Sequence, residues 1–198
     1  YDGHELNQMY IDDVVVDSES VKLSLPYISS DALDPLSCKT EINRSLTPLL
    51  FDSLFGVDNN FKAFTIMAES YKISDGKLTV SIKNNLIFSD LGSVSANDVV
   101  DSFEKAKKSD RYKNALSHIS GAVSTGTYTV VFDVDSDNED LCSLLTFPII
   151  KIGSEVSSEN KTEVPIGCGR YILSKDANNM LYLTANSNRH GGYEPVYK

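Results

Sequence analysis

The alternation of hydrophobic and polar residues is clearest between residues 67 and 106. Within it, residues 79–83 alternate polar and apolar side chains, which is typical of a half-buried strand. The tripeptide Ser74-Asp75-Gly76 comes just before them and favours a tight turn, because glycine adopts positive φ without steric strain. The pattern therefore predicts two antiparallel strands joined by this turn.

A helical pattern follows the predicted hairpin. Ser95 is a favourable N-cap, because its hydroxyl can bind a free backbone N–H, and Asp98 suits the positive end of a helix. Apolar residues then recur at helical spacing on one face, namely Val99, Val100, Phe103 and Ala106. We predict a helix that begins after Ser95.

The same reasoning gives the remaining elements. Residues 1–20 are polar and acidic except at Val14-Val15-Val16, and we interpret them as an extension with one short strand. An apolar stripe over residues 41–55 predicts a helix, in which Pro48 removes one backbone donor. We predict strands at 21–25 and 128–134, looser helical segments at 109–120 and 141–145, and a hairpin formed by 171–174 and 181–184.

Length and charge narrow the classes of function. A chain of 198 residues suits one domain or two small ones. Its formal charge of −10 argues against nucleic acid or an anionic membrane as a partner, because phosphate binding needs clustered lysine and arginine. We attribute the acidity to solubility rather than to an acid-selected ligand. The sequence contains no run of 18 apolar residues that could span a bilayer.

Catalytic and metal-binding motifs are missing from the sequence. The three histidines lie outside any HExxH motif, and there is no GxSxG elbow. The acidic run 133–139 fails the calcium-loop pattern, since its sixth and twelfth positions hold Asn138 and Leu144. The three cysteines form no zinc motif, and an odd number leaves at least one of them without a partner in the chain. We predict no catalytic residue, metal or cofactor.

Four sequence blocks, in order, carry a resemblance to a known family. The first contains Ala68-Glu69-Ser70-Tyr71, Ser74-Asp75-Gly76, 88–92 and 94–100. The others are Val164–Tyr171, 185–195, and a weaker one formed by Asp34-Pro35 and 47–55. Together they resemble the extracellular solute-binding proteins of oligopeptide, dipeptide and nickel ABC transporters. The resemblance covers roughly residues 21–198, and Arg170 stands where the family has proline.

The resemblance implies a mixed α/β fold, the N-terminal lobe of a type II periplasmic-binding protein with a mixed sheet core and an inserted subdomain. Residues 1–20 would be an N-terminal extension, 21–66 and 153–198 the two parts of the core lobe, and 67–152 the inserted α+β subdomain. Family members are much longer, so we expect the second lobe, and a leader peptide, to lie outside this sequence.

The implied function is non-catalytic. The protein would capture peptides or similar small solutes outside the cell, as a monomer, and deliver them to ABC permease subunits. It would be extracellular and anchored as a lipoprotein, or periplasmic. With one partial lobe, we expect the chain alone to bind peptide weakly or not at all. The alternative is a stand-alone extracellular sensor or interaction domain that reuses the same lobe.

The resemblance also implies a ligand site in the loop after the first strand and at the start of the next helix. The predicted contacts there are Lys39, Thr40, Glu41, Asn43 and Arg44. Their charges could pair with the termini of a peptide, or could form a solvated helix start, and the sequence leaves both readings open. The chain has no tryptophan, so aromatic stacking would fall to tyrosine or phenylalanine.

Cys38 and Cys168 both fall near the implied cleft. The sequence favours free thiols over a Cys38–Cys168 disulfide, and Cys142, in an apolar run, is predicted to be a buried small hydrophobe. Gly167 and Gly169 flank Cys168 in a segment that lacks the features of a phosphate-binding loop. We interpret this segment as a tight turn that needs the φ freedom of its glycines.

Overall fold

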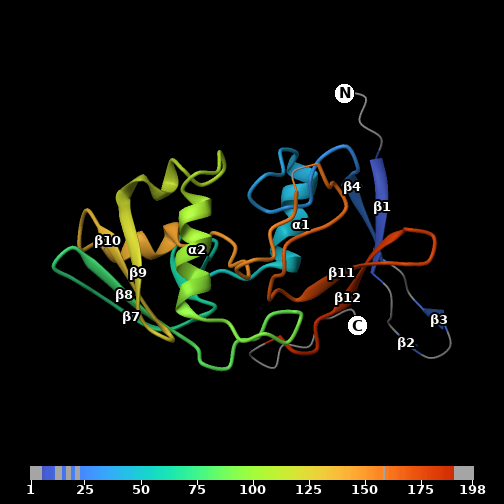
Figure 1. Cartoon of the computed structure of the whole chain (residues 1–198). Coiled ribbons are helices and arrows are strands. Elements are labelled where there is room, and N and C mark those ends of the chain that lie inside the picture. Colours follow the sequence, from blue (N-terminus) through green and yellow to red (C-terminus); the bar gives the residue numbers. More distant parts are fainter. Residues whose placement is uncertain (1–5, 12–14, 17–18, 21–22, 158, 190–198) are drawn as a thin grey trace.

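The computed structural model describes residues 6–11, 15–16, 19–20, 23–157 and 159–189, and Figure 1 shows them as two α/β halves side by side. In the residues that the structure describes, each half contains a four-stranded sheet and one α-helix. The first half is built from both ends of the described chain, and the second from its middle. The fold class is mixed α/β, as predicted, while the exact domain limits at residues 66 and 152 stay a prediction.

The sheet of the first half has the order β11-β12-β1-β4, with β12 parallel to β1 and the other neighbours antiparallel. Its strands are β11 (Tyr171–Lys175), β12 (Leu181–Ala185), β1 (Leu6–Ile11) and β4 (Leu23–Ile28). Helix α1 (Glu41–Leu50) packs against β4 and β11. Among the described residues, the core of this half includes Leu33, Leu46, Leu50, Phe51, Ile150, Tyr171, Leu181 and Leu183. The predicted hairpin near the end of the chain is confirmed.

The prediction that residues 1–20 form an extension is wrong for β1. This strand lies inside the sheet, antiparallel to β4 along its whole length and parallel to β12 through Tyr10 and Ile11. Backbone hydrogen bonds make such pairings, so the acidic residues that flank Leu6–Ile11 in the sequence did not exclude a central strand there. The short strand expected near Val14–Val16 exists as β2 (Val15–Val16), which pairs with β3 (Glu19–Ser20). Val14 is outside the described residues.

The second half has an antiparallel sheet with the order β7-β8-β10-β9. Its strands are β7 (Ala68–Ser74), β8 (Lys77–Ile82), β10 (Thr129–Val134) and β9 (Ile119–Gly126). The predicted turn joins β7 and β8, and both Asp75 (φ 55°) and Gly76 (φ 69°) adopt the left-handed conformation. Such a pair of positive φ values is typical of the hairpin turn whose twist matches the strands. The hairpin prediction is confirmed.

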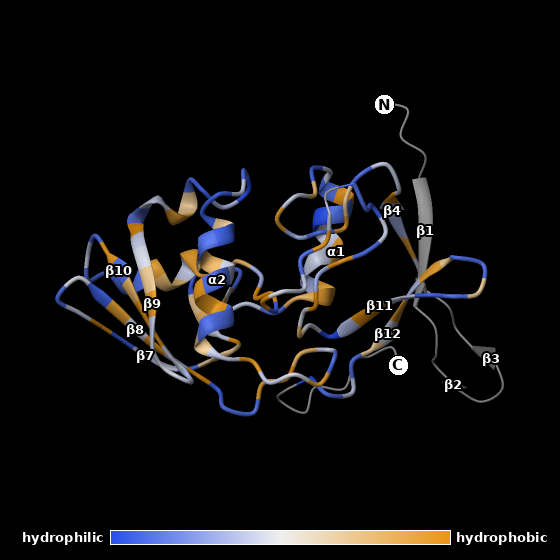
Figure 2. Cartoon of the chain, viewed as in Figure 1, coloured by the Kyte–Doolittle hydropathy of each residue, from blue (hydrophilic) through white to orange (hydrophobic). Residues whose placement is uncertain are grey.

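Helix α2 (Ala96–Ala106) packs against β9 and β10, and polar and apolar residues alternate along it (Figure 2). The backbone N–H and the hydroxyl of Ser95 both donate to the Asp98 carboxylate, at 2.9 and 2.7 Å. The predicted helix start is thus confirmed. Val99, Phe103 and Ala106 are fully buried in the core of this half, with large neighbours such as Phe55, Phe88, Phe132 and Phe147.

The helix predicted over residues 41–55 ends earlier, at Leu50. Phe51 is extended, and the chain continues into β5 (Phe55–Val57), which pairs with β6 (Ala63–Thr65). Pro48 lies within α1 and lacks an N–H, and the Thr47 hydroxyl donates to the Arg44 carbonyl at 2.9 Å instead. The helix therefore tolerates the proline without leaving that carbonyl unpaired.

The looser helical predictions have mixed outcomes. Residues 109–120 contain turns and one short 3₁₀ helix, η1 (Ala115–His118), and the chain then enters β9. Strand β9 was missed, because its small and polar residues give little alternation. The segment 141–145 overlaps a second 3₁₀ helix, η2 (Glu139–Leu144). Neither of the α-helices in the described chain has the length or apolar character needed to span a bilayer.

The three cysteines, Cys38, Cys142 and Cys168, are all buried and all free. The Cys38–Cys168 disulfide, the less favoured alternative, is therefore wrong. Burial raises the pKa of Cys142 to about 11 and that of Cys168 to about 12, because the thiolate would lose its hydration. The Cys168 sulfur instead lies 3.8 Å from the sulfur of Met67. Both behave as small core residues, as predicted for Cys142.

Candidate functional site

Two adjoining hollows open on the surface beside the end of α1, with volumes of about 470 and 440 Å³. They share part of their lining, so we treat them as one concave surface and call it the shared hollow. The common residues are Pro48, Phe51, Asp52, Ser53, Phe64 and Ile66. These residues come from α1, from the segment that follows it and from the β5–β6 hairpin. Ligand sites in proteins are commonly concave and mostly apolar, with a few polar groups.

The β5–β6 hairpin supplies an aromatic ring to the shared hollow. Phe64 pairs across the hairpin with Gly56, and a Cβ at Gly56 would lie 2.4 Å from the Phe64 ring. The ring therefore occupies the space that a side chain on Gly56 would need. Phe64 is nevertheless 49% exposed. This arrangement holds an apolar face in place where a solute can contact it.

A buried ion pair forms part of the wall. The Arg189 side chain donates to both carboxylate oxygens of Asp52, from Nε at 2.9 Å and from a terminal nitrogen at 3.0 Å. The two side chains are only 7% and 10% exposed. The bidentate geometry fixes both partners. It joins the segment after α1 to the segment after β12, residues that are 137 positions apart.

Two glycines allow another segment to pack against the end of α1. The Gly169 N–H donates to the Leu50 carbonyl at 3.0 Å. A Cβ on Gly167 or Gly169 would lie within 2.6 Å of the Leu50 backbone. Neither glycine is among the described residues with positive φ. The prediction that they supply φ freedom is therefore wrong, because close backbone approach is what requires them.

Cationic side chains surround the shared hollow. The Lys83 ammonium donates to the Ile66 carbonyl at 2.5 Å, which holds it at the wall. Arg111 lies at the other end, donates to the Thr47 hydroxyl at 3.3 Å and covers the ring of Tyr112 at 5.2 Å. Arg170 also lines the hollow. The lining thus combines apolar surface with positive charge.

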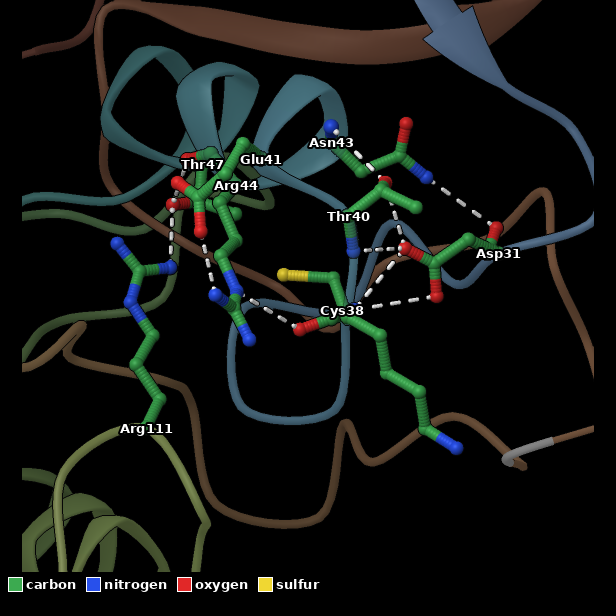
Figure 3. Close-up of polar contacts among 9 residues, drawn as sticks. Asp31, Cys38, Thr40, Glu41, Asn43, Arg44, Thr47 and Arg111 are labelled. Atoms are coloured by element: carbon green, nitrogen blue, oxygen red, sulfur yellow. Dashed lines mark hydrogen bonds and ion pairs between the residues drawn. The ribbon is translucent and has the colours of Figure 1, made fainter. Parts of the chain in front are cut away.

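Four of the residues predicted as ligand contacts, Thr40, Glu41, Asn43 and Arg44, lie together at the start of α1 (Figure 3), and Lys39 directly precedes Thr40 in the chain. Asp31 organises this region, since its carboxylate accepts bonds from the N–H groups of Ala32, Lys39 and Thr40 and from the Thr40 hydroxyl. Burial alone would raise the pKa of Asp31, but these hydrogen bonds outweigh it and hold the pKa below its usual value. Asp31 thereby fixes the loop that leads into the helix.

The predicted contacts Asn43 and Thr40 are engaged within the chain. The Asn43 side chain is buried, accepts from the Ile28 N–H at 2.8 Å and donates to the carbonyls of Ile28 and Ala32, both at 3.0 Å. The Thr40 hydroxyl donates to Asp31 and accepts weakly from the Asn43 N–H, which caps α1. These side chains stabilise the link between β4 and α1.

The charged members of the set are nearer to solvent. Lys39 is exposed, and the Arg44 guanidinium pairs with Glu41 at 2.5 Å, one turn of helix away. Arg44 also donates to the Cys38 carbonyl at 3.3 Å. Among the described residues that line the shared hollow, none belongs to the predicted five. Ligand binding by Lys39, Thr40, Glu41, Asn43 and Arg44 stays a prediction.

Sequence reasoning missed the residues of the shared hollow. A signal was present, because Asp52, Arg170 and Arg189 all fall within the family-like blocks 47–55, 164–171 and 185–195. The described residues contain no group of three or more His, Cys, Asp or Glu side chains that could hold a metal ion. The arrangement suits reversible binding of a solute that has apolar and anionic parts.

Solved structures share this fold. MoaA from Agrobacterium tumefaciens R10, in complex with mannopinic acid, has a TM-score of 0.69 and 22% identity over 80% of this chain. AppA from Bacillus subtilis, in complex with a nonapeptide, has 0.60 and 19% over 77%. NikA from Brucella suis, in complex with Fe(III)-EDTA, has 0.60 and 17% over 76%. The chain matches part of a type II periplasmic-binding-protein fold and spans only 32–37% of these three chains.

The sequence itself identifies the family. Residues 64–196 match the family described as bacterial extracellular solute-binding proteins, family 5, middle region. This match covers more than half of the chain, which therefore belongs to that family. Membership confirms the predicted resemblance, and the family is one of solute-binding proteins rather than of enzymes.

Proposed function

We propose that this chain forms part of the solute-binding lobe of an ABC importer that captures peptides or similar small solutes outside the cell. Family membership over residues 64–196 supports this proposal, and so does the shared hollow. The observation that carries it is the hollow itself, where the exposed ring of Phe64 lies beside fixed cations on a non-catalytic scaffold.

Capture would work by closure of two lobes around the solute. The shared hollow is open, and a second lobe that closes over it would exclude water and strengthen every electrostatic contact inside. The start of α1, with Lys39, Thr40, Glu41, Asn43 and Arg44, is a second proposed contact region. The receptor would act as a monomer, anchored as a lipoprotein or free in the periplasm, and would deliver its solute to ABC permease subunits.

The chemistry of the solute is proposed only as a class. The relatives with solved structures hold a nonapeptide, a metal chelate and mannopinic acid, so this fold accommodates different molecules. A hollow that is mostly apolar and carries cations suits a solute that has apolar side chains and at least one anionic group. Peptides with a free C-terminus have both features.

The test uses the protein expressed from the complete reading frame that contains this segment. Native mass spectrometry and calorimetry would measure which solutes it retains from peptide, amino-acid-conjugate and nickel–histidine pools. We expect a retained solute of unchanged mass. Chemical conversion of the solute would contradict the proposal. A reading frame that couples this lobe to a signalling region, with no second lobe, would favour the sensor alternative.

A further inference from the structure

The part of the shared hollow next to β8 has an unusual charge for this chain. Lys83, Arg170 and Arg189 line it, and Asp52 is the one acidic residue among the lining residues that the structure describes. Asp52 is already held by Arg189 in a buried bidentate pair. The formal charge of the whole chain is −10. A concave surface whose charged lining residues are mainly cationic therefore differs in charge from the chain as a whole.

Lys83 is held in position without a carboxylate partner among the described residues. Its backbone N–H donates to the Met67 carbonyl at 3.0 Å, and its ammonium donates to the Ile66 carbonyl at 2.5 Å. A neutral carbonyl uses one of the three ammonium protons and leaves the positive charge uncompensated by an anion. Because the side chain is half-buried, an anion that enters the hollow would gain a strong charge-assisted hydrogen bond.

The apolar surface beside Lys83 favours an anionic group that is part of an organic molecule. Phe64 and Ile66 both line the hollow, and Ile66 also supplies the carbonyl that holds the ammonium. The exposed Phe64 ring cannot move toward the hairpin, because it lies directly over Gly56. A small inorganic anion would leave this apolar surface in water, whereas an organic acid would cover it.

We propose that this part of the shared hollow is a carboxylate subsite, in which Lys83 binds the acid group of the solute and Phe64 packs against its apolar part. The inference deepens the proposed function and rests on it for the identity of the solute as a peptide or peptide-like acid. The subsite selects acids over their neutral amides.

The test compares two probes that differ only in their terminal group, a carboxylate in N-acetylphenylalanine and a neutral carboxamide in N-acetylphenylalaninamide. Each would be titrated to millimolar concentrations into the ¹⁵N-labelled 198-residue chain, and amide chemical shifts would be followed by NMR. We expect the acid to shift the signals of Lys83, Phe64 and Ser53 and to bind about tenfold more tightly than the amide, the effect of one charge-assisted hydrogen bond.

Variants separate the charge effect from the apolar one. Lys83→Gln should abolish the preference for the acid, and Lys83→Arg should retain it. Lys72→Gln, on the exposed part of β7, is the matched control and should leave both affinities unchanged. Phe64→Ala should weaken both probes by the same factor. The amide dispersion of each spectrum reports whether the variant is folded.

Three outcomes would overturn the subsite: equal affinity for acid and amide, shifts that map away from the hollow, or no shifts with either probe. The proposed function is judged separately, by solute retention in the complete protein. Failure of retention there with a clear acid preference here would reject the importer role and leave the carboxylate subsite. The converse result would reject only the subsite.

Discussion

The Asp52–Arg189 pair gives the sharpest prediction for stability. It joins segments that are distant in the sequence, and the Asp52 backbone carbonyl also accepts from the Ile149 N–H at 2.9 Å. Asp52→Ala would leave the guanidinium of Arg189 in a site that is 10% exposed, without its carboxylate. We expect a large loss of stability, because the buried guanidinium would lose both of the hydrogen bonds that the Asp52 carboxylate accepts.

The size of the loss follows from this burial. Breaking a buried ion pair by removing one partner typically lowers the free energy of unfolding by about 3–5 kcal/mol. With an m-value of about 2 kcal/mol/M, the urea midpoint would fall by roughly 1.5–2.5 M. The assay is urea unfolding followed by circular dichroism and by tyrosine fluorescence, since the chain has ten tyrosines and no tryptophan.

The control is an ion pair at the surface. Asp110 pairs with Lys113 at 2.5 Å, but its side chain is 94% exposed, so Asp110→Ala should leave the midpoint almost unchanged. A double-mutant cycle with Arg189→Ala would isolate the coupling between the buried partners from the other contacts that each one makes. If Asp52→Ala destabilised the chain no more than Asp110→Ala, the pair would not stabilise the wall of the hollow.

Three further predictions test other parts of the structure. Gly169→Ala should lower the unfolding free energy by about 1–3 kcal/mol or more, because the added Cβ would overlap the Leu50 backbone. The control Gly126→Ala adds a Cβ with ordinary contacts only and should have little effect on the urea midpoint. The three cysteines should react slowly with Ellman's reagent at pH 8, since burial raises their pKa values, and all three should react after denaturation; a lower final count would reveal a disulfide. Because the pKa of Asp31 is lowered in the folded state, its carboxylate should stabilise the fold above the unfolded-state pKa of about 4, and this stabilisation should be lost as pH falls through the lower folded-state pKa. The difference in unfolding free energy between the wild type and Asp31→Asn should therefore shrink in acid. A difference that does not depend on pH would reject this.

Local signals explain which elements could be predicted. The β7–β8 turn needs only Asp75 and Gly76, and α2 needs only its cap at Ser95 and an apolar face, so each is encoded within about ten residues. Strand β1 is different, because its parallel neighbour β12 lies far along the chain, with Tyr10 opposite Tyr182. Nothing near Tyr10 in the sequence identifies that partner, and the polar and acidic character of residues 1–20 as a whole argued against a core strand.

The glycines on either side of Cys168 also depend on a segment that is distant in the sequence. Sequence reasoning recognised that Gly167 and Gly169 matter, and it chose φ freedom as the cause. The cause is the backbone of Leu50, which approaches so closely that a Cβ on either glycine would overlap it. Local rules can weigh backbone conformation at a glycine, but close approach depends on a segment more than a hundred positions away.

The candidate site follows the same principle. The five residues at the start of α1 were chosen from one continuous stretch. In the structure, the Thr40 side chain caps α1 and the Asn43 side chain bonds to the loop before it. The shared hollow instead combines residues from positions 47 to 189. The sequence blocks that carried the family resemblance contain Asp52, Arg170 and Arg189, which line the wall of the hollow. Close packing and ion pairing bring those blocks together only in the folded chain. No single stretch of the sequence could therefore identify the site alone.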